Sequence, residues 1–284
     1  SYVYSGWNTT AETGNRQLME VKFDHIAEKY DREFTYSQIG LRQRRSVWNY
    51  LDRLLPDDRA LDILELNCGT GEDAVYFAKQ GHSVIATDVS EMMVKATQQK
   101  AKRKGVSNRI QTMRLAMEDI SEFHFDRKFD IIFSDFGGLN CVEPVEFQRM
   151  SQVFARLLRP GGHFVGVVMP HVCLWESWYF MVRFRFKRMF RRATNKEVAV
   201  NIEGKMVETW YYSPSRIKNY FGKDFDYKAK RPIGFFIPPS YLERFFIKRL
   251  KWLTLLEKLE RVVSWMPWLA ALSDHFLIDL QNRK

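Results

Sequence analysis

The chain has 284 residues, of which 45% are hydrophobic and 27% are charged, values ordinary for a soluble globular protein. Its net charge of +10 is unevenly spread, because residues 170–284 hold 22 lysines and arginines against 11 acidic residues. This surplus suggests an anionic partner such as nucleic acid, a membrane surface or a phosphorylated substrate, although a solvated basic face would look the same.

The three cysteines, Cys68, Cys141 and Cys173, are far apart and form no C-x-x-C pair. Their spacing argues against a disulfide framework and a zinc site, so we expect a reducing compartment and no metal. No apolar run reaches the roughly 18 residues that span a bilayer, and the polar, aromatic start lacks a signal-peptide pattern. A cytoplasmic location is therefore expected, with peripheral contact to a membrane as an alternative.

Short strand-like segments alternate with helical patterns over residues 59–168. The segment at 129–134 is nearly continuously apolar, as fits a strand buried on both faces. This alternation predicts a parallel sheet covered by helices on both sides. In chain order we expect strands at 59–66, 83–87, 110–115, 129–134 and 163–168, with helices at 72–80, 91–104 and 145–158 between them.

After Met169 the pattern changes, and aromatic and basic residues become frequent. We expect helices at 174–192, 213–221 and 241–264, and strands at 225–235 and 274–280. The two late strands would complete an α/β fold with a doubly wound, seven-stranded, mostly parallel sheet. The helical and aromatic segments between residues 170 and 274 would be insertions that form a cap.

The most informative segment is the turn from Glu65 to Gly71, which joins the first strand to the next helix. A glycine-rich turn lets a ligand approach the backbone, and Asp88, at the end of the second strand, is placed to accept hydrogen bonds from ribose hydroxyls. Gly69, Gly71 and Ala74 also fit the dinucleotide fingerprint, and an ordinary tight turn is a further alternative.

The charge near the turn distinguishes between a dinucleotide and a cofactor that has no phosphate. A pyrophosphate needs the positive end of a helix, but Glu72 and Asp73 occupy that helix start. S-adenosylmethionine (SAM) has no phosphate and carries a sulfonium and an ammonium, so nearby acids suit it. Glu65 is placed for the ammonium. The sequence therefore favours SAM.

The stretch from Leu64 to Met93 resembles the first two motifs of the class I SAM-dependent methyltransferases. Three further segments resemble that family in the same order: the lead-in at 23–31, the fourth-strand motif at 129–134, and the Leu-Leu-Arg-Pro-Gly-Gly turn at 157–162. The resemblance covers residues 20–170 well and the remainder loosely. It implies a helical lead-in or lid at 1–50, a SAM-binding core at 51–170, and a cap with the last two strands at 171–284.

The resemblance also implies roles for particular residues. Around the methionine part of SAM it places Glu65, Asn67, Gly69 and Gly71, with Ser134 below; Asp88 would hold the ribose. Val89 and Met93 would enclose the adenine, with Met117 and Glu118 at its edge. Tyr30 would cover the sulfonium or form part of the acceptor site. Arg42 would reach the SAM carboxylate, with Arg44 and Arg45 as alternatives.

Two positions depart from the family pattern. Asn67 stands where glycine is usual, and asparagine tolerates the positive φ that the turn requires. Ala116 stands where an aspartate often binds the adenine amino group, so that contact falls to Glu118, Asp119 or a backbone carbonyl.

Methyl transfer from a sulfonium depends largely on positioning, and a hydroxyl, phenol or carboxylic acid acceptor can also need a general base. His171, just after the fifth strand, is the candidate base, with a packing role as the alternative. Asp135 and Asn140 follow the fourth strand and are candidates for orienting the acceptor. The Asn/Asp-Pro-Pro-Tyr/Phe tetrapeptide of nucleic-acid amino methyltransferases is absent at Ser134–Gly137.

The second half of the chain is compatible with several classes of methyl acceptor. Its interleaved aromatic and basic residues would suit nucleic acid, a membrane surface or a greasy, anionic molecule, and aromatics at helical spacing also form ordinary core. We expect a small, hydrophobic or lipid-like acceptor held by the inner, apolar faces of the segments at 174–192 and 241–264. The alternatives are an RNA methyltransferase and a non-catalytic SAM-binding regulator.

Overall fold

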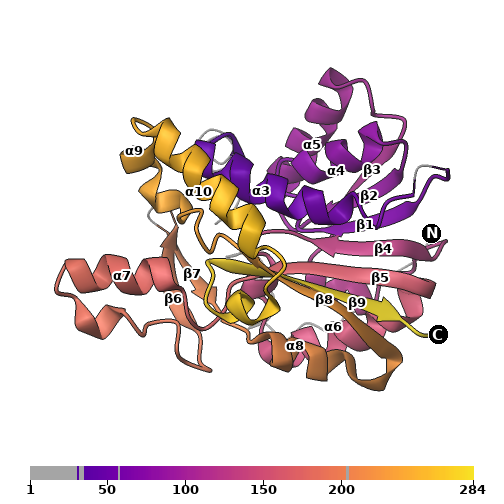
Figure 1. Ribbon diagram of the computed structural model, residues 1–284. Coiled ribbons are helices and arrows are strands. Elements are labelled where there is room, and N and C mark those ends of the chain that lie inside the picture. The colour runs from indigo at the N-terminus through magenta and orange to yellow at the C-terminus, as the bar shows by residue number, and fades with distance from the viewer. Residues whose placement is uncertain (1–30, 32–34, 57, 203–204) are drawn as a thin grey trace.

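The computed structural model describes residues 31, 35–56, 58–202 and 205–284. Its centre is a seven-stranded sheet in the order β3-β2-β1-β4-β5-β9-β8, in which only β9 runs antiparallel to its neighbours (Figure 1). This confirms the doubly wound, mostly parallel α/β sheet that the sequence predicts. Its strands are β1 (Asp62–Leu66), β2 (Ser83–Asp88), β3 (Ile110–Arg114), β4 (Phe129–Ser134), β5 (Leu158–Val168), β8 (Phe225–Ile233) and β9 (His275–Asn282).

Helices cover both faces of this sheet (Figure 1). Apolar side chains of α3, α4 and α5 join one hydrophobic cluster, and those of α6 and α8 join the other. Ser90 and Ser213 cap α5 and α8, because each side chain accepts a hydrogen bond from a backbone amide of the first turn. The bounds of these helices are α3 (Gln38–Leu51), α4 (Glu72–Lys79), α5 (Glu91–Arg103), α6 (Pro144–Leu157) and α8 (Pro214–Phe221).

The strand register gathers several chain segments at one edge of the sheet. Leu66, at the end of β1, pairs with Ser134, at the end of β4, so the turn after β1 lies beside the residues that follow β4. Because β9 is antiparallel, its beginning reaches the same edge, where Phe276 pairs with Val168 at the end of β5. Ligands bind at this carboxyl edge in open α/β sheets.

The second half departs from the predicted helices. α7 (Leu174–Val182) ends ten residues before the predicted limit, because the chain turns at Phe184, whose φ is 54°, and passes through a short 3-10 turn. The predicted long helix is divided into α9 (Glu243–Phe246) and α10 (Leu250–Val263), with a non-helical backbone at Arg249. Helical spacing of apolar residues indicates the helices but does not locate these breaks.

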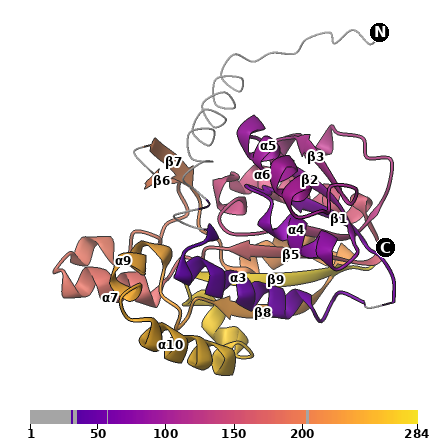
Figure 2. The ribbon, with the colours of Figure 1, turned by 90° about the horizontal axis from the view of Figure 1, so that it is seen from above.

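A hairpin that the sequence analysis did not predict stands apart from the main sheet (Figure 2). Its strands, β6 (Val198–Ile202) and β7 (Lys205–Thr209), pair antiparallel. The hairpin lies between the fifth and sixth strands of the main sheet in sequence. With α7 and α9 it extends the molecule beyond the carboxyl ends of the parallel strands (Figure 1).

Candidate functional site

The turn after β1 adopts the strained geometry that its residues allow. Asn67, Gly69 and Gly71 have φ values of 48°, 54° and 79°, a region in which glycine and asparagine are favoured. A Cβ at Gly71 would lie 2.5 Å from the Thr97 side chain. Gly71 therefore allows the start of α4 to pack against α5, and it does not line the cavity described below.

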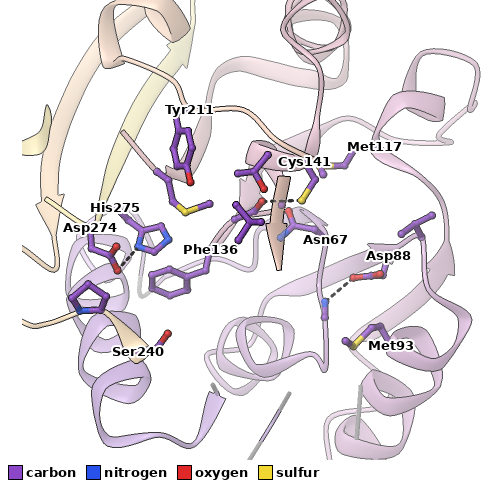
Figure 3. Close-up of a pocket in the computed structure, with 18 of the residues that line it drawn as sticks. Asn67, Asp88, Met93, Met117, Phe136, Cys141, Tyr211, Ser240, Asp274 and His275 are labelled. Carbon is purple, nitrogen blue, oxygen red and sulfur yellow. Dashed lines mark hydrogen bonds and ion pairs between the residues drawn. The ribbon is translucent and has the colours of Figure 1, made fainter. Parts of the chain in front are cut away.

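Asp88 ties this turn to the end of β2. One carboxylate oxygen accepts a hydrogen bond from the Gly69 amide at 2.9 Å, and the other accepts one from the Ser90 amide at 3.0 Å (Figure 3). The side chain still lines the cavity beside the turn. Its carboxylate thus holds the backbone in place and presents an acceptor to a ligand hydroxyl.

A cavity of about 380 Å³ opens beside the turn, within the size range of small-molecule sites. The end beside the turn is mostly apolar and includes the carboxylates of Asp88 and Glu118. Apolar walls suit a flat aromatic ring, and a carboxylate suits the hydroxyls of an attached sugar. The lining there consists of Asn67, Gly69, Asp88, Val89, Met93, Leu115, Met117 and Glu118. Seven of these eight are residues assigned to the cofactor from the sequence.

A buried charged cluster lies beneath the turn. Arg44 on α3 pairs with Asp73 at the start of α4 and lies 3.4 Å from Asp135. Burial, followed by the neighbouring Asp73 carboxylate, raises the pKa of both Glu65 and Asp135 well above their usual range, against the opposing charge of Arg44. The cluster combines acids and a guanidinium, a donor set that fits the ammonium and carboxylate of an amino acid.

Arg42 does not take part in this cluster. It lies 3.1 Å from Glu257 of α10, and Arg45 contacts the same glutamate. Arg42 and Arg44 are two residues apart on a helix and so point in roughly opposite directions. Of the three arginines considered for the SAM carboxylate, Arg44 lies beneath the turn, whereas Arg42 and Arg45 contact Glu257.

Ser134, another residue predicted to contact the cofactor, supports the turn from below. Ser134 is fully buried and donates a hydrogen bond to the Asn67 side chain, which in turn donates to the Asp135 carbonyl at 2.7 Å. Tyr30 lies outside the described residues.

The second end of the cavity is formed by the segments that follow β4, by the cap and by the start of β9. Aromatic and sulfur-containing side chains dominate it, with charged groups at one side (Figure 3). Its lining includes Phe136, Cys141, Met169, Arg191, Arg192, Tyr211, Tyr241, Asp274 and His275. One continuous cavity therefore joins the Asp88 end to the His275 end.

His275 and Asp274 lie side by side at this second end. His275 Nδ1 lies 3.3 Å from the Asp274 carboxylate (Figure 3), and Arg192 donates to the same carboxylate at 3.2 Å. Burial alone would raise the pKa of Asp274, but the charges of His275 and Arg192 outweigh it and hold that pKa well below its usual range. Asp274 is therefore an anion whose carboxylate faces the His275 imidazole.

The predicted acceptor residues lie elsewhere. His171 is half-buried, with Nδ1 3.1 Å from the Arg192 carbonyl, and it does not line the cavity. Asn140 donates to the Trp210 carbonyl at 2.6 Å and accepts from the Met169 amide at 2.9 Å, so it joins backbone segments. Asp135 belongs to the charged cluster under the turn. None of these three residues lines the cavity.

The cap also differs from expectation. Residues 191–192, the hairpin and residues 239–241 reach the cavity, but α7 and α10 contribute no lining residue. The buried apolar residues of these helices instead pack against one another and against Ile39 of α3. Of the two segments expected to hold the acceptor, 174–192 and 241–264, the residues that line the cavity are Arg191, Arg192 and Tyr241.

Sequence reasoning missed the Asp274–His275 pair, although a signal for it was present. The predicted strand at 274–280 begins with these two residues. In an antiparallel strand the first residues lie at the carboxyl edge of its parallel neighbours, so polar residues there are site candidates.

The sequence of the chain is similar to those of known methyltransferases. Residues 63–162 match the model of a family described as a methyltransferase domain. The tRNA 5-carboxymethoxyuridine methyltransferase of Escherichia coli strain K12 is 31% identical over 147 residues, which are 51% of this chain and 55% of that protein. The demethylmenaquinone methyltransferase of Bacteroides fragilis is 32% identical over 154 residues, covering 52% and 59%.

Among solved structures, a 1,6-didemethyltoxoflavin-N1-methyltransferase from Burkholderia thailandensis shares the fold. Its TM-score is 0.56, with 14% identity over 99% of this chain and 94% of that one. The chain is thus similar to SAM-dependent methyltransferases: its residues 63–162 match a methyltransferase domain, and its described residues share the fold of the class I enzymes. It spans little more than half the length of the curated relatives that it matches.

Proposed function

We propose that this chain transfers a methyl group from SAM to a small, hydrophobic or lipid-like acceptor. The observation that carries the proposal is the single cavity that joins Asp88 to His275. Its Asp88 end matches the requirements of the cofactor, and its other end offers Phe136, Met169 and Tyr211 to an apolar molecule. Enclosure by apolar groups with a few polar ones is typical of small-molecule sites.

SAM supplies a methyl group on a sulfonium, and the residues of this chain supply position and a proton acceptor. The acceptor oxygen or nitrogen would take the methyl group, and the electron pair of the broken carbon–sulfur bond would stay with the sulfur of the cofactor. The proton of the acceptor passes to the His275 imidazole, whose positive charge Asp274 balances across 3.3 Å. In this proposal His275 replaces His171 as the general base.

Acceptor identification tests the function directly. The protein is incubated with isotopically labelled SAM and a cell extract separated into lipid, small-molecule and RNA pools, and labelled products are identified by mass spectrometry. Label in the lipid or small-molecule pool is expected. Label in RNA would support the alternative suggested by the similarity to a tRNA methyltransferase. Normal SAM binding with no label in any pool would indicate a non-catalytic regulator.

The two histidines provide a matched test of the base. With the identified acceptor, His275→Asn should lower kcat about 100-fold or more, the usual contribution of general base catalysis. His171→Asn should leave kcat nearly unchanged because His171 lies outside the cavity. Calorimetric SAM binding checks that both variants fold. Equal kcat values for His275→Asn and the unmodified protein would remove His275 from the mechanism.

A further inference from the structure

Large apolar side chains are exposed along two segments of the cap. We call the exposed residues of 178–190 and 241–268 together the outer face. Trp252 is 63% exposed and Phe184 is 82% exposed, far more than a packed core residue would be. The other exposed apolar residues of the outer face are Trp178, Met181, Val182, Phe186, Phe190, Tyr241, Phe245, Ile247, Leu250, Leu255, Leu259, Val262, Trp265, Met266 and Trp268.

The two segments of the outer face are in contact. The ring centroids of Tyr179 and Tyr241 are 5.5 Å apart, and those of Trp175 and Phe246 are 6.2 Å apart. These contacts join α7 to η6 (Ser240–Leu242) and α9, and both views place α7 and α9 at the end of the molecule away from α5 (Figures 1 and 2). Apolar patches of this extent usually mark an interaction site.

Charges on the outer face are separated by sign. The acids of its two segments are occupied inside the fold: Glu243 accepts from the Gln38 and Ile39 amides, Glu257 pairs with Arg42, and Glu260 accepts four backbone amides. The bases point outward. The exposed ones are Arg183, Arg185, Arg188, Arg244, Lys248, Arg249, Lys251 and Lys258, and Arg261 is exposed as well but pairs with Glu257 at 3.0 Å.

We propose that the outer face binds an anionic lipid surface. Its bases match negatively charged head groups, its tryptophans suit the interfacial region, and its aliphatic side chains can enter the acyl layer. Aliphatic residues such as Ile247, Leu255 and Val262 cannot stack on bases, so RNA would leave this part of the face unused. No helix in the described part of the chain is long and apolar enough to span a membrane, and surface attachment needs none.

Vesicle binding by the full chain tests this proposal, whatever the acceptor is. The protein should sediment with vesicles of phosphatidylcholine mixed with phosphatidylglycerol and remain free with phosphatidylcholine alone. Added salt should weaken the binding because it screens the charges. Tryptophan emission should shift to shorter wavelength as Trp252 and Trp268 leave water. Failure to bind the anionic vesicles would overturn the proposal.

Matched variants separate a specific face from general charge. Lys248→Glu with Lys251→Glu should weaken binding to the anionic vesicles by about 25-fold or more, since each lysine near such a surface contributes substantially. Lys102→Glu with Lys104→Glu makes the same charge change at the end of α5, away from the outer face, and should have little effect. Equal losses in the two pairs would contradict a defined face.

The apolar contribution has its own control. Phe184→Ser with Trp252→Ser should abolish vesicle binding, whereas Val145→Ser, at an exposed apolar position on α6, should not. Tighter binding to bulk tRNA than to the vesicles would assign the face to RNA. Self-association in light scattering, lost in the Phe184→Ser with Trp252→Ser variant, would assign it to a second copy of the chain. Either result would overturn the lipid assignment.

Discussion

Asp88 has two tasks at once, because its carboxylate holds the Gly69 and Ser90 amides while it faces the cavity. Asp88→Ala should therefore weaken SAM binding by roughly 1.5–3 kcal/mol, the cost of losing hydrogen bonds to a charged group. Calorimetry would measure the change, with Asp126→Ala, an exposed aspartate, as control. Normal affinity in Asp88→Ala would remove the ribose assignment, and NAD binding as tight as SAM binding would contradict the cofactor choice.

The three cysteines should differ sharply in reactivity. Cys141 lines the cavity, whereas Cys68 and Cys173 are buried, and burial raises the pKa of Cys173 to about 12. The thiolate is the reactive form, so iodoacetamide should modify Cys141 alone in the folded protein. S-adenosylhomocysteine should slow that reaction by filling the cavity. Peptide mass spectrometry would follow each site, and modification of Cys173 as fast as Cys141 would contradict the structure.

Among the elements, α10 is fastened to the chain after β8 by one side chain. The two Glu260 oxygens accept hydrogen bonds from the amides of Gly234, Phe235, Phe236 and Ile237 at 2.6–3.1 Å. This contact fixes the segment that leads to Pro239–Tyr241 and so to the cavity. The Glu260 side chain therefore holds α10, which carries part of the outer face, to the segment that leads to the cavity.

Glu260→Gln replaces one of the two acceptor oxygens by a donor group and leaves backbone amides unpaired. It should lower the free energy of unfolding by at least about 2 kcal/mol, because each unpaired buried donor costs about 1–3 kcal/mol. Urea unfolding would measure the loss. Glu91→Gln, at a partly exposed surface position, should change stability little. A Glu260→Gln variant as stable as the unmodified protein would show that α10 is held by its apolar contacts alone.

At the scale of the whole molecule, the last strand completes the core. β9 lies between β5 and β8, its Leu277 and Ile278 are fully buried, and Asp279 accepts a hydrogen bond from Tyr50 of α3 at 2.6 Å. The first and last parts of the described chain are thereby joined.

A fragment that ends at Met169 should therefore be insoluble or should unfold without cooperativity. It would lack β8 and β9, leaving the apolar residues of β5 exposed along one edge of the sheet. Circular dichroism during urea unfolding and calorimetry with SAM would test this. A fragment that unfolds cooperatively and binds SAM would show that residues before 170 form an independent core.

The sequence by itself determined the sheet, the cofactor turn and Asp88. These features are local, since a glycine-rich turn follows a strand and an acid ends the next strand, and parallel strands bring such ends to one edge. The bounds of β4, those of α8 to within one residue and the end of β1 were predicted for the same reason, from apolar runs and capping residues within each segment, whereas β1 begins three residues after its predicted start.

Only the tertiary structure decided which neighbouring residues face the site. Arg42 and Arg44 share one helix, yet Arg44 is the one that lies in the charged cluster beneath the turn. His171 and His275 both lie at the carboxyl edge of the sheet, yet His275 is the one that lines the cavity. Aromatic spacing on α7 and α10 likewise does not say whether a side chain packs inward or faces solvent. Each outcome depends on long-range packing against segments far away in sequence, which a local pattern does not encode.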